Sequence, residues 1–298
     1  MSNILITYFC AMFFFEETCA FQRMTVDRDY VNASNLSRTS PSRPRGLWKV
    51  WKCNDVVKRR VVALKIVSKK KQELNTPEPD EIKIQIRLKH VNVVRLFEAL
   101  QDSLHWYLPM ELGENGSLES WIKARGVFVD HEAKFIMRSV LRALQYISGR
   151  GIFHGDLKPM NVVLGSGLIP KVTDFGASVI IGANDGATGR IGTVDYQSPE
   201  MITGKNYSFK SDIYSAGCCF FRLYQSGTPV IPHMAHPRPE VEVPRKRLFD
   251  TPLSIPTGMS PQGVKLIKEL LKVDPRNRPN ASEALRHSFF KLFLCLSS

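Results

Sequence analysis

The chain has 298 residues, of which 43% are hydrophobic and 23% are charged, which is typical of a globular protein with a sizeable core. No apolar run reaches the roughly 18–20 residues that a membrane helix needs, so we expect no membrane span. The net charge of +13 is not accompanied by a nucleic-acid-binding motif, and we expect no nucleic-acid partner.

Residues 1–44 differ from the rest of the chain and predict a flexible or atypical extension. Residues 4–15 have the length of a signal-peptide core, but no Lys or Arg precedes them and two glutamates follow at once, which disfavours a secretory signal. Residues 34–45 are rich in serine and proline, as linkers are. The six cysteines form no CxxC pair, which favours free thiols in a reducing compartment. We therefore expect a cytoplasmic protein, and the basic run 245–247 would allow nuclear access.

Predicted strands dominate the next part of the chain. Alternating and β-branched residues predict strands at 49–53, 60–68, 93–100 and 105–112. Residues 81–89 fit a strand by alternation and a helix by their position after a turn, and the pattern alone does not decide.

Predicted helices dominate the second part. Apolar spacing predicts helices at 117–124, 131–149, 210–226, 261–272 and 281–290. Strands first and helices later indicate an α+β protein built of two packed bodies.

A cluster of polar residues in the segment 154–161 has the chemistry of phosphoryl transfer. Such transfer needs an oriented nucleophile, neutralised phosphate charge and a held metal. Asp156 can accept a hydrogen bond from an attacking hydroxyl, and Lys158 can lie against the phosphoryl group. Asn161 can offer a hard oxygen to Mg²⁺. Thirteen residues later, Asp174 begins the run Asp-Phe-Gly and can place further oxygens on the metal.

Together with four further motifs, these runs resemble the eukaryotic protein kinase family, serine/threonine type, over about residues 46–293. The other motifs are Val-Ala-Leu-Lys at 62–65, Ser-Pro-Glu at 198–200, the run beginning Ser-Asp at 211–217 and the run 274–279. The resemblance implies a two-lobed protein-kinase-like fold. A small β-rich N-lobe would span residues 45–112 and a larger α-helical C-lobe residues 113–293.

The resemblance also implies roles for individual residues. Lys65 would hold the α- and β-phosphates of ATP, and Glu81 would pair with it, which makes 81–89 a helix. Met110 would be the gatekeeper, and the backbone of Glu111 and Leu112 would meet adenine. The nucleotide-binding set implied in this way is Gly46, Val50, Ala63, Lys65, Met110, Glu111, Leu112 and Val163. Asn161 and Asp174 would be the metal ligands, and Asp156, Lys158, Lys65 and Glu81 the catalytic residues.

Structural pairs and substrate class follow from the same resemblance. Glu200 would pair with Arg278, and Asp212 would brace the catalytic loop. Lys158, and Thr193 in its Gly-Thr step, are typical of kinases that act on serine and threonine rather than tyrosine.

Four departures from the family pattern stand out. The glycine-rich loop would place Arg43, Arg45 and Trp48 where the family has glycines, and only Gly46 remains. Bulky residues there would weaken ATP binding, because backbone amides approach phosphate only where no side chain intervenes.

The other three departures concern single positions. Gly155 replaces the usual arginine that binds a phosphate of the activation segment, so Thr188 and Thr193 need not be regulatory sites. Gln85 replaces an apolar residue in a stack with Leu96, His154 and Phe175. Pro109 has no backbone N–H to donate to a neighbouring strand, so its own strand should be irregular.

Two hypotheses follow. The first is a monomeric Ser/Thr kinase that uses ATP and Mg²⁺ to phosphorylate a protein substrate. The alternative is a pseudokinase, a scaffold or regulator with weakened ATP binding. A third reading is that residues 1–45 replace a glycine loop encoded elsewhere in the gene.

Overall fold

The computed structural model describes residues 24–26, 48–69, 78–182, 186–188, 192–225 and 255–291. The chain divides into two compact units. The sheet unit comprises Met1–Pro77 and Phe97–Met110, and the helical unit comprises Glu78–Leu96 and Glu111–Ser298. The segment 78–96 therefore groups with the helices, although it lies between strands in the sequence.

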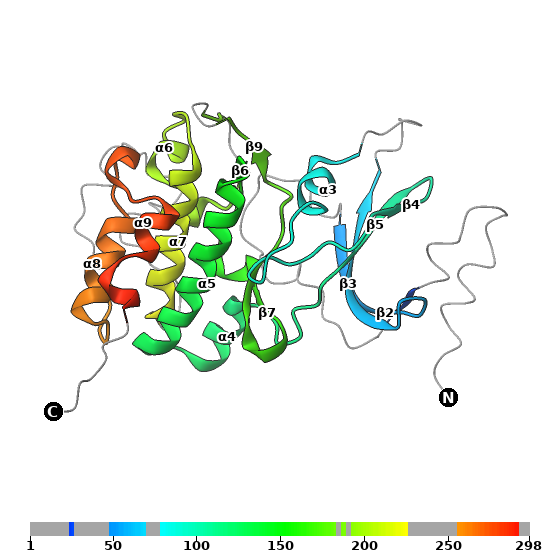
Figure 1. Cartoon of the computed structure of the whole chain (residues 1–298), viewed down its shortest axis with the longest axis horizontal. Helices are drawn as coiled ribbons and strands as arrows, with labels where there is room; N and C mark the ends of the chain where they lie inside the picture. The colour runs from blue at the N-terminus through cyan, green and yellow to red at the C-terminus, as the bar shows by residue number, and fades with distance from the viewer. Residues whose placement is uncertain are drawn as a thin grey trace, which may run out of the picture. The chain divides into compact units, whose positions relative to one another are not determined.

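The sheet unit is built on one antiparallel sheet in the order β1-β2-β3-β5-β4. Strand β3 has four consecutive buried residues and lies at the centre of the sheet. One face carries a small apolar cluster of Cys53, Val62, Leu64 and Tyr107. The strands are β1 (Met24–Val26), β2 (Trp48–Asp55), β3 (Arg60–Ser68), β4 (Leu100–Gln101) and β5 (His105–Met110), and Figure 1 labels β2 to β5.

Two features of this sheet differ from the sequence-based predictions. Strand β1 pairs with the end of β2 although it lies within the predicted extension. Strand β5 is regular at Pro109, contrary to the prediction, and its register with β3 is unbroken from Ala63 to Ser68. The Pro109 carbonyl accepts the Phe97 N–H at 3.0 Å, so the backbone of this residue faces away from β3 and the missing donor breaks no bond between β3 and β5.

The helical unit packs around α5 and α7. These two helices contact each other, and α5 also contacts α9 while α7 contacts α8 (Figure 1). Among the described residues no helix combines the length and the apolar character needed to cross a bilayer. The helices are α3 (Asp80–Gln85), α4 (Leu118–Arg125), α5 (Asp130–Ser148), α6 (Pro199–Ile202), α7 (Phe209–Leu223), α8 (Pro261–Leu270) and α9 (Ala281–Leu285). The strands are β6 (Ile152–Phe153), β7 (Val162–Leu164), β8 (Pro170–Val172) and β9 (Val179–Ile180).

Three predicted elements are shorter than the sequence pattern indicates. The prediction of a helix over 81–89 is confirmed only to Gln85, after which Arg87 and Leu88 close 3-10-type bonds. The predicted strand 93–100 is wrong except at Leu100, since Val93 makes only an isolated bridge to Val172. The predicted helix 281–290 ends at Leu285, and a 3-10 turn follows at Ser288–Phe290.

Candidate active site

The segment 154–158 is anchored by a buried carboxylate of α7. Asp212 accepts the backbone N–H of His154 at 2.8 Å and that of Gly155 at 3.1 Å, as the resemblance implied. Burial raises the pKa of Asp212 to about 6, although these hydrogen bonds oppose the shift. Gly155 itself has φ +81°, a left-handed conformation that glycine adopts without strain. The anchor fixes the backbone immediately before Asp156.

The two carboxylate oxygens of Asp156 bind three polar side chains. Oδ1 accepts the Thr193 hydroxyl at 2.7 Å, and Oδ2 accepts Lys158 Nζ at 2.8 Å. Lys158 Nζ also donates to the Thr193 hydroxyl oxygen at 2.7 Å, which closes a three-membered ring of hydrogen bonds. Asn161 Nδ2 donates to Oδ2 at 3.2 Å and to the Asp156 carbonyl at 2.8 Å. The carboxylate is therefore fixed in one orientation, as a group that must position a hydroxyl has to be.

The chain around Asp174 brings further acidic oxygens to the helical unit. Asp174 has φ +65°, a conformation that is uncommon for a residue with a side chain and that occurs often at functional sites. A methyl group built on Gly176 would lie 3.3 Å from Asp174 Oδ1 and 3.5 Å from Glu81 Oε2. The carboxylates of Glu81 and Asp174 thus both lie beside Gly176.

The donor set here suits magnesium. Because Asn161 directs its amide nitrogen at Asp156, its carbonyl oxygen remains available as a ligand. A carboxylate and an amide oxygen are hard ligands, and Mg²⁺ usually takes one or two protein groups and completes its shell with phosphate and water. Within the described residues no three His, Cys, Asp or Glu side chains form a metal cluster. A magnesium ion that takes only one or two protein ligands needs no such cluster.

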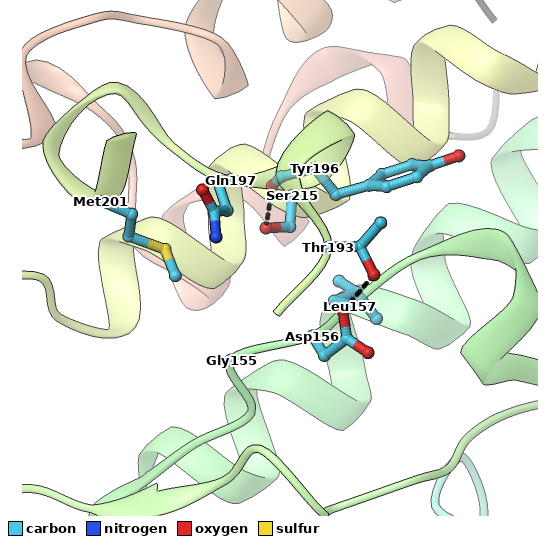
Figure 2. A pocket seen from close by; sticks show the side chains of 8 residues that line it. All are labelled: Gly155, Asp156, Leu157, Thr193, Tyr196, Gln197, Met201 and Ser215. Atoms are coloured by element: carbon cyan, nitrogen blue, oxygen red, sulfur yellow. Dashed lines mark hydrogen bonds between the residues drawn. The ribbon is translucent and has the colours of Figure 1, made fainter. Parts of the chain in front are cut away.

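A shallow depression without room for a water molecule lies next to this hydrogen-bonded ring (Figure 2). Asp156 and Thr193 lie on one side of it, and Ser215 of α7 donates to the Tyr196 carbonyl at 2.7 Å. The residues lining the depression are Gly155, Asp156, Leu157, Thr193, Tyr196, Gln197, Met201 and Ser215.

The sheet unit holds four of the predicted nucleotide-binding residues on one face. Val50 is the cross-strand partner of Lys65, and Met110 is that of Ala63. Ala63 and Lys65 are two residues apart on β3, so their side chains point to the same side. All four side chains therefore share the face opposite the Cys53 cluster, and Lys65 is only 4% exposed.

Three further predicted nucleotide-binding residues lie in the helical unit. A methyl group on Gly113 would lie 2.6 Å from the Val163 Cβ, so Val163 lies directly under the segment 111–113. The Glu111 N–H donates to Arg95 O at 2.8 Å, and its side chain pairs with Lys171 at 2.9 Å. Within the described chain the Glu111 carbonyl and the backbone of Leu112 form no backbone hydrogen bond, so they remain available to a ligand. Gly46 lies outside the described residues.

The sequence motifs extend over most of a known family. Residues 47–290 match the protein kinase domain. The chain belongs to the protein kinase family. An Aurora kinase of Eremothecium gossypii is 32% identical over 234 residues, which are 78% of this chain and 62% of that protein. Calcium-dependent protein kinase 3 of Plasmodium yoelii yoelii is 33% identical over 247 residues, 81% of this chain and 45% of that protein.

A third relative is named as inactive. The inactive serine/threonine-protein kinase PLK5 of Mus musculus is 31% identical over 247 residues, 81% of this chain and 40% of that protein. The chain spans between 33% and 62% of the length of the first curated relatives it matches, including a probable serine/threonine-protein kinase fhkD of Dictyostelium discoideum. The kinase domain is thus the part of those proteins that this chain shares.

The kinase ion pair between Glu200 and Arg278 is present and buried. Arg278 donates to both Glu200 oxygens, at 2.9 and 3.1 Å, and its side chain has no exposed surface. Three backbone carbonyls accept its remaining donors. The pair ties the end of the activation segment to the loop after α8.

Gln85, which stands where the family has an apolar residue, packs inside the kinase core without opening it. Gln85 is fully buried, and its Nε2 donates to the Val94 carbonyl at 3.2 Å. Leu96, His154 and Phe175 are buried as well, and the rings of the last two meet edge to face at 5.1 Å. His154 Nε2 lies 3.1 Å from the Thr173 carbonyl, so this histidine has a structural role.

The sequence motifs did not indicate how closely the activation segment approaches the catalytic loop. Gly192 has φ +81°, and a methyl group there would lie 2.2 Å from the Gly155 carbonyl oxygen. Only glycine fits this contact, which places the next residue, Thr193, against Asp156. A glycine directly before a threonine was the one available signal.

Proposed function

We propose that this kinase domain transfers the γ-phosphoryl group of ATP to serine or threonine hydroxyls of a protein substrate. The ring of hydrogen bonds among Asp156, Lys158 and Thr193 carries the proposal. It supplies an oriented carboxylate, a cation and the Thr193 hydroxyl at one point.

Each residue has a separate task in the proposed reaction. When bound, Mg-ATP supplies the phosphoryl group and the positive charge that offsets it. Asp156 orients the substrate hydroxyl and accepts its proton as the new P–O bond forms and the bond to the β-phosphate oxygen breaks. Lys158 stabilises the negative charge on the oxygens in transfer. Asn161 and Asp174 would hold the metal.

The choice of serine and threonine rests on Lys158 and Thr193. They bond to each other at 2.7 Å beside Asp156, and by the family resemblance both residue types are typical of kinases that act on serine and threonine. Relatives named as serine/threonine kinases support the same choice. The proposed N-lobe of 45–112 and C-lobe of 113–293, the monomeric state and the cytoplasmic location stay predictions.

Regulation by phosphorylation of the activation segment is not expected. The position of the phosphate-binding arginine is Gly155, and the Thr193 hydroxyl is already engaged by Asp156 and Lys158. A kinase of this kind would be active as synthesised, or controlled elsewhere.

The test is incorporation of labelled γ-phosphate into a panel of serine, threonine and tyrosine peptides. Lys65→Met and Asp156→Asn are expected to abolish it, while Lys69→Met, in the residue that follows β3, should leave it intact. Absence of labelling by the unaltered protein with both Mg²⁺ and Mn²⁺ would contradict the proposal.

A second candidate function is a kinase-fold regulator that does not transfer phosphate. The observation behind it is the sequence at the glycine-rich loop, where Arg43, Arg45 and Trp48 stand at the glycine positions. It predicts no rise in melting temperature with Mg-ATP and unchanged cellular function in Asp156→Asn. A clear Mg-ATP-dependent rise that Lys65→Met removes would refute it.

A further inference from the structure

A stack of three side chains joins the segment after α3 to the end of α5. The rings of His90 and Tyr146 are stacked, with centroids 4.7 Å apart and planes 23° apart. The Arg150 guanidinium lies 3.7 Å from the centre of the same Tyr146 ring. The Tyr146 hydroxyl accepts the Lys89 N–H at 2.8 Å, and Arg150 also donates to the Tyr146 carbonyl at 3.1 Å. These contacts hold the His90 ring and the Arg150 guanidinium against Tyr146.

Arg142 adds a further cation to this stack. It lies one helical turn before Tyr146 on α5, on the same side of the helix. Lys89, Arg142 and Arg150 are exposed, and none of the three forms an ion pair with any described residue. Lys171, the other cation near His90, is already paired with Glu111. We call Lys89, His90, Arg142 and Arg150 the basic cluster.

The neighbouring cations also act on His90. Burial, and then the charges of Arg142, Arg150 and Lys171, lower the pKa of His90, and no carboxylate opposes them. His90 Nδ1 accepts the Asn92 N–H at 3.1 Å, so the neutral ring carries its proton on Nε2. That N–H is directed away from Asn92 and has no partner among the described residues.

We propose that the basic cluster binds a phosphorylated serine or threonine of a partner protein. Two guanidinium groups, an ammonium group and an imidazole N–H provide the charge-assisted donors that a phosphate dianion takes up. The site lies wholly within the helical unit and does not depend on phosphoryl transfer by this chain. It would recruit partners that another kinase has already modified.

A nucleic acid fits this surface less well. Single strands are held by aromatic faces that stack on bases, together with a track of several phosphate contacts. Here the Tyr146 ring already packs against His90 and Arg150, and the basic cluster consists of four residues. One phosphate on a folded or extended protein segment matches that size.

The experiment measures binding of the full chain to fluorescent peptide libraries with a fixed central phosphoserine or phosphothreonine. The same libraries without phosphate, a library with central aspartate and a single-stranded oligonucleotide are the comparisons. The test variant is Arg142→Ala/Arg150→Ala. Lys268→Ala/Lys272→Ala removes the same charge from two exposed lysines elsewhere in the helical unit and is the control.

The phosphorylated library is expected to bind at least about tenfold more tightly than its unphosphorylated form, and the arginine variant should lose that difference. The lysine control should keep it.

Three results would overturn the proposal. They are equal binding of both libraries, an equal loss in the lysine control, and tighter binding of the oligonucleotide than of the phosphopeptides. Arg142→Lys/Arg150→Lys controls for misfolding of the alanine variant, because it keeps the positive charge and should retain part of the affinity. Transfer to a short acceptor peptide should be unchanged in the arginine variants, which separates this site from the proposed active site.

Discussion

Removing Arg278 should destabilise the kinase domain more than removing any exposed arginine, because it leaves the Glu200 carboxylate buried without its cation. Glu200 is 5% exposed and would keep only the Ser211 hydroxyl, at 2.5 Å, as a side-chain partner. Breaking a buried pair from one side costs about 3–5 kcal/mol. For a unit of this size that corresponds to a fall in melting temperature of roughly 10 °C.

The control for this prediction lies two residues away. Arg276 pairs with Asp274 at 2.7 Å, but its side chain is 88% exposed, so Arg276→Met should leave the free energy of unfolding nearly unchanged. Urea unfolding followed by circular dichroism measures both variants. Equal effects of Arg276→Met and Arg278→Met would refute the reasoning.

The pH dependence gives the same prediction a second check. Burial alone would raise the pKa of Glu200, but the hydrogen bonds and charge of Arg278 hold it below its ordinary value. In the unaltered protein the stability from this group is therefore present above the unfolded pKa and is lost as the pH falls through the folded one. In Arg278→Met the buried Glu200 binds a proton readily, so that variant should gain stability as the pH falls. The difference between the two proteins should therefore narrow with acid, and a constant difference would contradict the account.

Three further changes have defined expected outcomes. Thr193→Val removes the hydroxyl bonded to Asp156 and should lower kcat by roughly ten- to a hundredfold in a peptide assay, while Thr193→Ser keeps it. Ser198 is fully buried, and its hydroxyl has no hydrogen bond to any described group, so Ser198→Ala should raise the free energy of unfolding by about 1 kcal/mol in urea. The pKa of Asp212 is raised to about 6 from 3.8, so its stability contribution is full below about pH 4 and is lost as the pH rises through about 6. Across that range the free energy of unfolding should fall by at most about 3 kcal/mol relative to that of Asp212→Asn, which lacks this titration.

The catalytic loop could be predicted from the sequence because its residues lie close together along the chain. Asp156, Lys158 and Asn161 are within six positions, so local geometry brings them together. Strand β3 was equally clear, since a run of β-branched residues matches a buried central strand. Its register then places Val50 and Met110 beside Lys65 and Ala63, which only the family resemblance had implied.

The parts that sequence reasoning missed depend on contacts between distant segments. Residues 93–100 have strand-like composition, but the hydrogen bond from the Val94 N–H to the Val172 carbonyl is not continued into a ladder. Pro109 looked disruptive because the sequence does not show which way a strand's N–H groups face. The bond from Thr193 to Asp156 joins residues 37 positions apart and depends on a glycine–glycine contact that no local pattern encodes.

Gly155 links these observations. It has a left-handed backbone, and its carbonyl oxygen would lie 2.2 Å from a methyl group on Gly192, so the two glycines form a close backbone contact. That contact holds Thr193 on Asp156 without a phosphate. The residues proposed for phosphoryl transfer in the helical unit are therefore ordered by their own hydrogen bonds. The two proposed functions then differ only in whether nucleotide binds, so nucleotide binding decides between them more directly than any substitution in the catalytic loop.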